Sequence, residues 1–333
     1  MTYSHDLGFN GVEPARYGMM RDNEKRQLRR QSNRTGLCLV AFTCIQLGVV
    51  GLLRVIPNAL YLYSAEPVFA DMLEMLIYLC SMLLPFLVAY RCMNPDERED
   101  CGLFEKPVSA WSAAAAVGAC FFFCTIGDFA TNYLLDFLEQ LGFSVGGGTY
   151  DPATNLPDMF GELLLIAVLP ALVEEFAMRC IVLQPMRRFG DRYAVLMSAF
   201  VFALMHGNLV QIPFAFVAGI AFGYYVVATG SIWVGVLAHF LNNAYSVVLN
   251  YLVETTPEAA NRVYQLTISI TLVFGLLCVV LFWKVCPHQK LQKKTTALSG
   301  GEKTAVYLFT VPMVIAVLRF IISAVELIDF VGV

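Results

Sequence analysis

Nine apolar stretches separated by short polar segments dominate this sequence of 333 residues and limit what it can fold into. In a lipid bilayer, only an α-helix or a closed β-barrel satisfies all of its own backbone hydrogen bonds, and these stretches lack the alternation of barrel strands. The sequence therefore predicts an all-α, polytopic membrane protein with eight or nine transmembrane helices. The stretches cover roughly residues 36–62, 69–91, 108–127, 157–183, 193–206, 210–229, 231–253, 264–283 and 304–325.

The composition supports this prediction. Hydrophobic residues make up 58% of the chain and charged residues 14%, whereas a soluble domain has about 45–50% and about 25%. These proportions exclude a soluble enzyme and a disordered chain. The formal net charge of −4 offers no general attraction to phosphate, so we expect membrane lipids and no nucleic acid as partners.

The lysine and arginine residues indicate how the chain is oriented. Cytoplasmic segments of membrane proteins are enriched in these residues. If the N-terminus is inside, 18 of the 22 fall on inside segments. We therefore expect a cytoplasmic N-terminus, nine spans and a C-terminus on the outer side. The inside segments are the tail at 1–35 and the regions near 91–106, 187–192 and 284–303.

Five polar side chains stand inside apolar stretches, where ionisable groups cost several kcal/mol and are therefore candidates for function. Glu174 and Glu175 lie in the fourth stretch, His206 ends the fifth, and His239 and Asn243 lie in the seventh. Counting helical residues from the basic or polar segments nearby, Glu174 and His206 are about 20 Å deep, and His239 and Asn243 about 12 and 18 Å. We therefore expect three helices to place these groups at similar depth.

Other acids are interpreted as anchors at the outer helix ends, where they can reach water. These are Asp71, Glu74, Asp128, Glu326 and Asp329.

The local spacing of the five residues suggests what each can do. Glu175 and Arg179 are four residues apart on one helix, the spacing of an ion pair, while Glu174 points about 100° away and can act as a base. His239 and Asn243 have the same spacing and could donate hydrogen bonds to one oxyanion. Pro170 removes one backbone hydrogen bond just before the acidic pair, which predicts a bend in the helix.

These residues form the motifs E-E-x-x-x-R, F-x-x-x-H and H-x-x-x-N, complete and in this order on three apolar stretches. In this the sequence resembles the CPBP family of intramembrane proteases, also called the CAAX protease and bacteriocin-processing, or Abi, family. The motifs lie at Glu174–Arg179, Phe202–His206 and His239–Asn243. The resemblance covers roughly residues 155–253, which we interpret as a catalytic core. A cytoplasmic basic tail (1–35), N-terminal transmembrane helices (36–127) and C-terminal transmembrane helices (264–333) would make up the rest.

The resemblance implies a role for each residue. Glu174 would be the general base that activates a water molecule, and His206 would orient that water. His239 and Asn243 would form the oxyanion hole. Glu175, Arg179 and Phe202 would pack around these residues and hold them in position. The best-known members are type II CAAX prenyl endopeptidases, which cut the last three residues from prenylated proteins, and many bacterial members process bacteriocins or peptide pheromones.

Two questions stay open at this stage. Glu174, His206 and His239 could supply three zinc ligands, but they come from three helices without an H-E-x-x-H motif, so we favour a mechanism without a cofactor. The alternative functions are a non-catalytic membrane immunity or scaffold protein with the same fold, and a proton-coupled transporter.

The expected substrate is a lipidated or hydrophobic peptide segment. From the depth of the polar groups, we expect the site to open toward the cytoplasmic face. On the family's precedent, we expect a multi-pass protein of the cell membrane.

Overall fold

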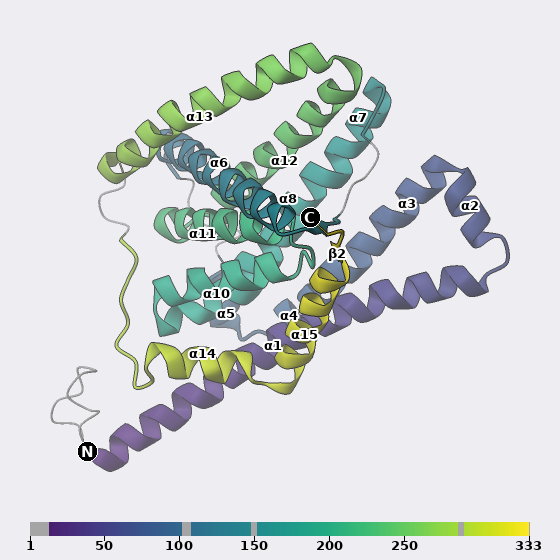
Figure 1. The fold of residues 1–333 in the computed structure, drawn as a ribbon. Helices are drawn as coiled ribbons and strands as arrows, with labels where there is room; N and C mark the ends of the chain where they lie inside the picture. The colour runs from purple at the N-terminus through teal and green to yellow at the C-terminus, as the bar shows by residue number, and fades with distance from the viewer. Residues whose placement is uncertain (1–12, 102–107, 148–151, 286–289, 333) are drawn as a thin grey trace. The chain divides into compact units, whose positions relative to one another are not determined.

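The computed structural model describes residues 13–101, 108–147, 152–285 and 290–332, and almost all of its regular structure is helical (Figure 1). Lys106 and the side chain of Asp71 are not among the described parts. Among the described residues, seven helices are long and apolar enough to cross a membrane, or eight if one bent pair counts as a single span. The predicted all-α, polytopic membrane fold is confirmed. The chain divides into two compact units, residues 1–98 with 294–318 and residues 99–293 with 319–333.

The first unit is built around one long helix, α1 (Pro14–Val55). Residues 14–35, expected as a basic tail, are therefore helical and continue directly into the first apolar stretch. Within this unit, the buried carboxylate of Glu97 accepts hydrogen bonds from Gln31 (3.2 Å) and Arg34 (3.1 Å). The other elements are α2 (Ala59–Ala65), α3 (Pro67–Tyr78), a π-helical segment (Leu79–Leu83), α4 (Leu84–Arg91), α5 (Pro95–Glu99) and α14 (Gly300–Leu308).

Two apolar stretches that we expected to be single helices are broken. The first ends at Val55, and the chain turns at Asn58, whose φ of 61° lies in the left-handed region. The last is divided between α14 and α15 (Val311–Glu326), which meet at an angle of 82°. Pro312 just beyond this bend has no backbone N–H to continue the helix of α14.

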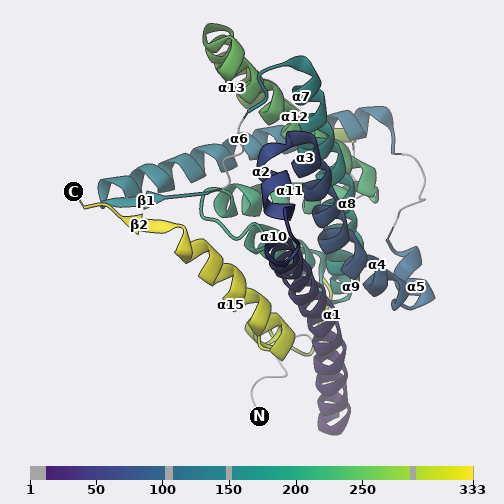
Figure 2. The same ribbon diagram turned by 90° about the vertical axis from the view of Figure 1, so that its right-hand side faces the viewer.

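The second unit contains the three motifs. Its chain begins with α6 (Ala110–Gln140) and β1 (Phe143–Val145), which pairs antiparallel with β2 (Ile328–Phe330) near the C-terminus (Figure 2). The motif-bearing helices follow, and the last long helix runs back beside α6. In chain order they are α7 (Leu156–Glu162), a π-helical segment (Leu163–Val168), α8 (Leu169–Glu175), a second π-helical segment (Phe176–Leu183), α9 (Gln184–Met186), a short 3-10 turn (Arg187–Phe189), α10 (Asp191–Leu204), α11 (Ile212–Thr229), α12 (Ile232–Thr255) and α13 (Pro257–Val285).

The helices of this unit run antiparallel between two ends. Along α6 and α13, Gly118 packs on Cys278 and Thr125 hydrogen-bonds Thr271, so the start of α6 lies at the end of α13. Asp191 joins the same end, because its backbone N–H donates to Gln292 (3.1 Å).

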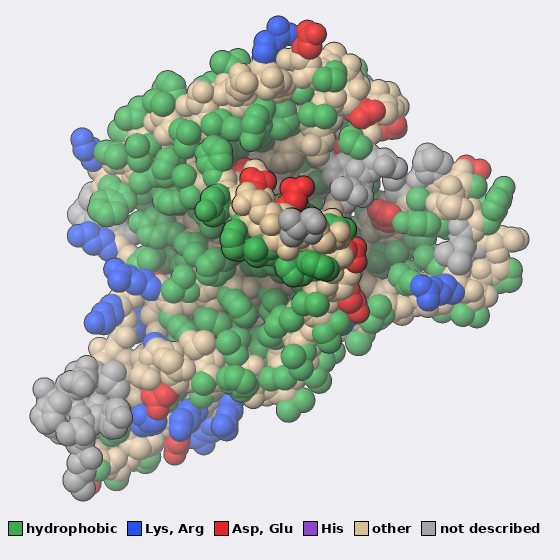
Figure 3. All heavy atoms as spheres, in the orientation of Figure 1, with side chains coloured by type: hydrophobic (Ala, Val, Ile, Leu, Met, Phe, Trp, Pro, Cys, Tyr) green, Lys and Arg blue, Asp and Glu red, His purple; other side chains and the backbone are tan. Residues whose placement is uncertain are grey.

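The charged residues separate between these ends. We call the end that carries Arg187, Arg188, Arg192, Lys284 and Lys290 the basic end. The opposite end is called the acidic end, and it carries Asp136, Glu139, Asp158, Glu254 and Glu258, with Arg262 as an exception. Figure 3 shows Lys and Arg side chains following one another along the edge where α13 ends.

Helix α10 is short but connects the two ends. Gly219 of α11 packs on Ala199 of α10, and Gly223 packs near Val195, so the two helices are antiparallel. Helix α10 therefore rises from Asp191 at the basic end to Leu204 near the acidic end. Its 14 residues measure about 21 Å.

Candidate active site

The first motif lies on a helix that departs from regular α geometry. Helix α8 stands between two π-helical segments, and Pro170 is its second residue. Because Pro170 has no N–H, it cannot donate the i→i−4 hydrogen bond of an α-helix to the carbonyl of Ile166. The side-chain amide of Asn243 donates to this carbonyl instead, at 2.9 Å. The proline predicted to disturb the helix thus creates an attachment point for a residue of the third motif.

Glu175 and Arg179 form the expected ion pair, and both side chains are completely buried. Arg179 Nε donates to Glu175 Oε2 (2.7 Å) and Nη2 donates to Oε1 (3.1 Å). This bidentate geometry matches a carboxylate well and compensates the charge of Glu175 within the protein.

Small residues on neighbouring helices complete this ion pair. Arg179 Nη1 donates to Ser198 Oγ (3.1 Å) and to the Gly219 carbonyl (3.4 Å). A Cβ atom at Gly235 would lie 2.6 Å from Glu175 Oε2, so only glycine leaves room for the carboxylate. Sequence analysis missed these three residues, because nothing in the local spacing distinguishes them from ordinary small residues of membrane helices.

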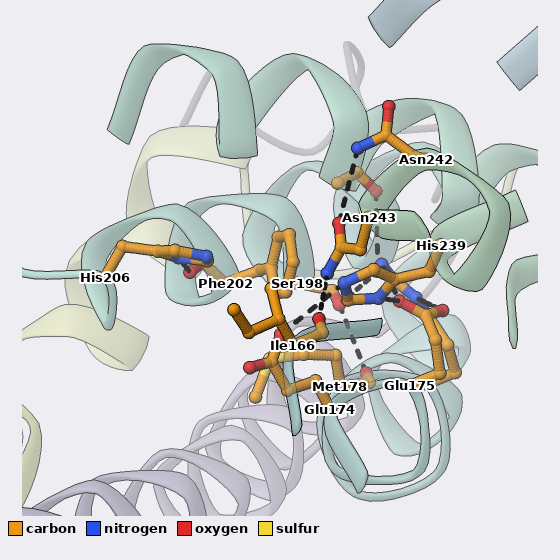
Figure 4. Close-up of polar contacts among 12 residues, drawn as sticks. Ile166, Glu174, Glu175, Met178, Ser198, Phe202, His206, His239, Asn242 and Asn243 are labelled. Atoms are coloured by element: carbon orange, nitrogen blue, oxygen red, sulfur yellow. Dashed lines mark hydrogen bonds and ion pairs between the residues drawn. The ribbon is translucent and has the colours of Figure 1, made fainter. Parts of the chain in front are cut away.

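His239 connects the two glutamates. Its Nδ1 lies 3.3 Å from Glu175 Oε1 and must carry the proton of that hydrogen bond, since a carboxylate only accepts. Its Nε2 lies 3.9 Å from Glu174 Oε2. The imidazole stacks on the ring of Phe222, with centroids 5.4 Å apart. The ring is therefore fixed with Nε2 toward Glu174 (Figure 4).

His206 is held by its own helix. Its Nδ1 donates to the carbonyl of Phe202 (2.8 Å), which leaves Nε2 as the acceptor in the neutral ring. The ring of Phe202 contacts both imidazoles, with centroids 5.0 Å from His206 and 5.8 Å from His239. It also lies 5.8 Å from the guanidinium of Arg179. Phe202 therefore packs against a side chain from each of the three motifs.

Glu174, His206, His239 and Asn243 all line one cavity of about 630 Å³. The structure therefore brings the four predicted catalytic residues to a common space, as the depth argument required. Sequence analysis missed other polar groups in this cavity, which come from α6, α12 and the loop before α11. They are Asp128, Thr131, Asn132, Gln211, Asn242, Tyr245, Ser246 and Asn250.

The interpretation of Asp128 as an anchor at a helix end was wrong. It lies 12 residues before the end of α6, and its side chain lines the cavity. Thr131 and Asn132 follow Asp128 at the i+3 and i+4 positions, but the spacing does not show which helices face this group, so its position opposite the motif helices becomes visible only in the folded unit.

The cavity also extends in a direction that we did not expect. From Glu174 and His239 it continues along α6 to Leu135 and along α12 to Asn250, toward the acidic end. On the other side, buried residues of α6, α11 and α12 pack into one core, among them Ala115, Ala228 and Val234. The expectation that the site opens toward the basic segments is therefore wrong. The depths were counted correctly. However, a group that lies about 20 Å from one face of a hydrocarbon layer about 30 Å thick is nearer to the opposite face.

The geometry bears on a metal ion as well. Within the described part of the chain, no three His, Cys, Asp or Glu side chains are grouped so that they could hold one. The candidate ligands Glu174 and His239 present Oε2 and Nε2 to each other at 3.9 Å. His206 uses Nδ1 for its own helix, so only Nε2 would be available. The side chains as arranged do not form a zinc site.

Comparison with known proteins agrees with the motifs. Residues 157–245 match a family model described as type II CAAX prenyl endopeptidase Rce1-like. This segment is therefore similar to an Rce1-like domain. The match confirms the resemblance to CAAX proteases over the segment that holds all three motifs, and it indicates a protease with a CAAX-type intramembrane fold. No curated protein and no solved structure matches the chain.

Proposed function

We propose that the protein is an intramembrane endopeptidase of the cell membrane, with its N-terminus in the cytoplasm. Its substrate would be a lipidated or hydrophobic segment of a membrane-associated protein or peptide. The single observation that carries this proposal is the common cavity of Glu174, His206, His239 and Asn243 within the Rce1-like segment. A buried polar cluster that only fixed helix register would not need an open volume of about 630 Å³.

In this proposal, the Glu174 carboxylate takes a proton from a water molecule. His206 Nε2 accepts a hydrogen bond from the same water molecule and thereby orients it. The hydroxide oxygen bonds to the carbonyl carbon of the scissile peptide, and the carbonyl oxygen becomes an oxyanion. When the tetrahedral intermediate collapses, the C–N bond breaks and Glu174 passes its proton to the leaving amine.

Two side chains would stabilise the oxyanion. An amide nitrogen carries two N–H groups, and Asn243 uses one of them for the Ile166 carbonyl, so the other can donate to the oxyanion. His239 donates from Nδ1 to Glu175, so donation from Nε2 requires an imidazolium ring.

The substitution Glu174→Gln tests this proposal. Because the amide cannot accept the proton, we expect cleavage of quenched fluorescent peptides, with and without farnesyl-cysteine, to fall by about 10²–10⁴-fold in proteoliposomes. The thermal unfolding temperature should not change. Glu258→Gln at the exposed start of α13 is the matched control. Cleavage by Glu174→Gln at the rate of the control would exclude Glu174 as the base.

We further propose that the water is activated without a metal ion, since one carboxylate and one imidazole face each other where three ligands would be needed. Dialysis against a chelator is then expected to leave peptide cleavage unchanged. Loss of cleavage that zinc alone restores would show that this part of the mechanism is wrong.

A further inference from the structure

The polar lining of the cavity lies on one side of the catalytic residues. Past His239, α12 contributes Asn242, Asn243, Ser246 and Asn250, which follow each other toward the acidic end. Helix α6 runs beside it and contributes Asp128, Thr131 and Asn132 in the same direction. In a membrane span, such groups are favourable only where they meet water or each other. They mark a wet passage from Glu174 to the acidic end.

On the other side of the catalytic residues, the described side chains are tightly packed. Phe222, which stacks on His239, is 2% exposed, and Ala238 beside His239 is 1% exposed. Both belong to a core cluster that continues through Ala228 and Val234 toward the basic end. Glu175 and Arg179 are completely buried behind it. Among the described residues, the lining of this cavity does not continue to the basic end. A separate, mostly apolar cavity of about 570 Å³ at that end is lined by Arg192, Trp283 and Leu291 among others, and by none of the four predicted catalytic residues.

The charges in the cavity carry a second argument. Among the described residues that line it, none is Lys or Arg, while Asp128 and Glu174 are acidic. A peptide cut three residues from its C-terminus would bring a carboxylate into this space, next to Asp128 and Glu174 and without a Lys or Arg among the described lining residues. The lining suits an internal, neutral or cationic segment better than a C-terminal tripeptide.

The orientation of the unit follows from its Lys and Arg residues. Arg187, Arg188, Arg192, Lys284 and Lys290 lie at the basic end, and short segments rich in these residues stay in the cytoplasm. We propose that substrates reach Glu174 through the acidic end, from the non-cytoplasmic side of the membrane. The substrate class is then an internal segment of a membrane-associated peptide exposed on that side. This inference presumes the proposed peptidase function, but the experiment that tests it does not depend on peptide cleavage.

Cysteine accessibility tests the proposal directly. Asn132→Cys and Asn250→Cys place a thiol in the passage, on two different helices. Glu258→Cys and Lys290→Cys mark the acidic and the basic end as matched controls. All four are made in one parent, in which the exposed Cys44 and Cys92 are serine. A sulfonated maleimide that does not cross membranes is added to intact cells and, separately, to permeabilised cells. The labelling of each variant above that of the parent is then measured.

We expect Asn132→Cys, Asn250→Cys and Glu258→Cys to be labelled equally with and without permeabilisation, and Lys290→Cys only after it. Labelling of the two passage variants only after permeabilisation, together with Lys290→Cys, would overturn the proposal. Absence of labelling at both passage positions in either condition would overturn it too, because the passage would not be wet. Since labelling does not depend on cleavage, an inactive Glu174 would leave this result unaffected, and the two proposals fail separately.

Discussion

The ion pair between Glu175 and Arg179 shows how much a single side chain here depends on its partner. Both side chains are at 0% exposure, and Arg179 has further hydrogen bonds to Ser198 and Gly219. A buried pair adds little net stability compared with apolar residues of the same size, but removing one partner leaves a charge without compensation. The pair therefore fixes where the helices lie and makes single substitutions severe.

At this site we predict that Arg179→Met lowers the free energy of unfolding by about 3–5 kcal/mol, because Glu175 would keep a buried charge. The double variant Glu175→Gln with Arg179→Met should lose less, since no buried charge remains. Arg262→Met, at an exposed position, should stay within about 0.5 kcal/mol. Denaturant unfolding in detergent measures all three. A double variant less stable than Arg179→Met would contradict the charge argument.

At the scale of single residues, sequence analysis found what helical spacing encodes. Glu175 and Arg179, or Phe202 and His206, are four residues apart, and the structure shows direct contacts within each pair. For Asp128 and Gly235, by contrast, the residues that matter lie on other helices. Their importance depends on which helix packs against them, and this is determined only when the unit folds.

Pro170 affects the site through the backbone of the helix that contains it. It cannot donate an i→i−4 hydrogen bond to the Ile166 carbonyl, and the side-chain amide of Asn243 on α12 donates to that carbonyl. Asn242 in turn donates to Asn243 Oδ1 at 3.3 Å. The amide of Asn243 is therefore held in the cavity by the Ile166 carbonyl on another helix and by Asn242.

We predict opposite effects of Pro170→Ala on stability and on activity. The new N–H can bond the Ile166 carbonyl, so unfolding should occur at the same or a higher temperature. The new N–H then competes with Asn243 for this carbonyl and shifts the amide, and a displacement of about 1 Å is expected to lower kcat by about 10²-fold. Thermal unfolding and peptide cleavage measure the two effects.

Pro257→Ala is the matched control for this substitution, because Pro257 begins α13, where a proline fits without loss. It should change neither the unfolding temperature nor kcat. If Pro170→Ala kept full kcat, the orientation of Asn243 would not depend on the Ile166 carbonyl.

Element boundaries were the least predictable part of the fold. The apolar runs located the helices, but not the turn at Asn58 or the bend of 82° between α14 and α15. The polar residues 14–35 join α1 because partners such as Glu97 are available within the first unit. Hydropathy measures transfer into lipid and contains no information about such partners.

For the whole molecule, the number of crossings decides on which side the C-terminus lies. The seven long helices and the bent pair together would cross eight times. Both termini would then be on the same side. Helix α10 has only 14 residues, about 21 Å, against a hydrocarbon thickness of about 30 Å. It nevertheless carries the chain from the basic end to the start of α11, since Ala199 and Val195 pack antiparallel on Gly219 and Gly223.

Counting α10 as a crossing gives an odd number, so we predict a cytoplasmic N-terminus and a C-terminus on the outer side. A fluorescent protein that matures only in the cytoplasm should be bright at the N-terminus and dark at the C-terminus, and alkaline phosphatase should show the reverse. An insertion of the same reporters after Lys290 should give the cytoplasmic result as a control. A bright C-terminal fusion would mean that α10 does not cross. If α10 does cross, either the bilayer becomes thinner around this short helix, or the polar loop at Gly207 and Asn208 lies below the outer surface. A loop in the second position would bring water to His206.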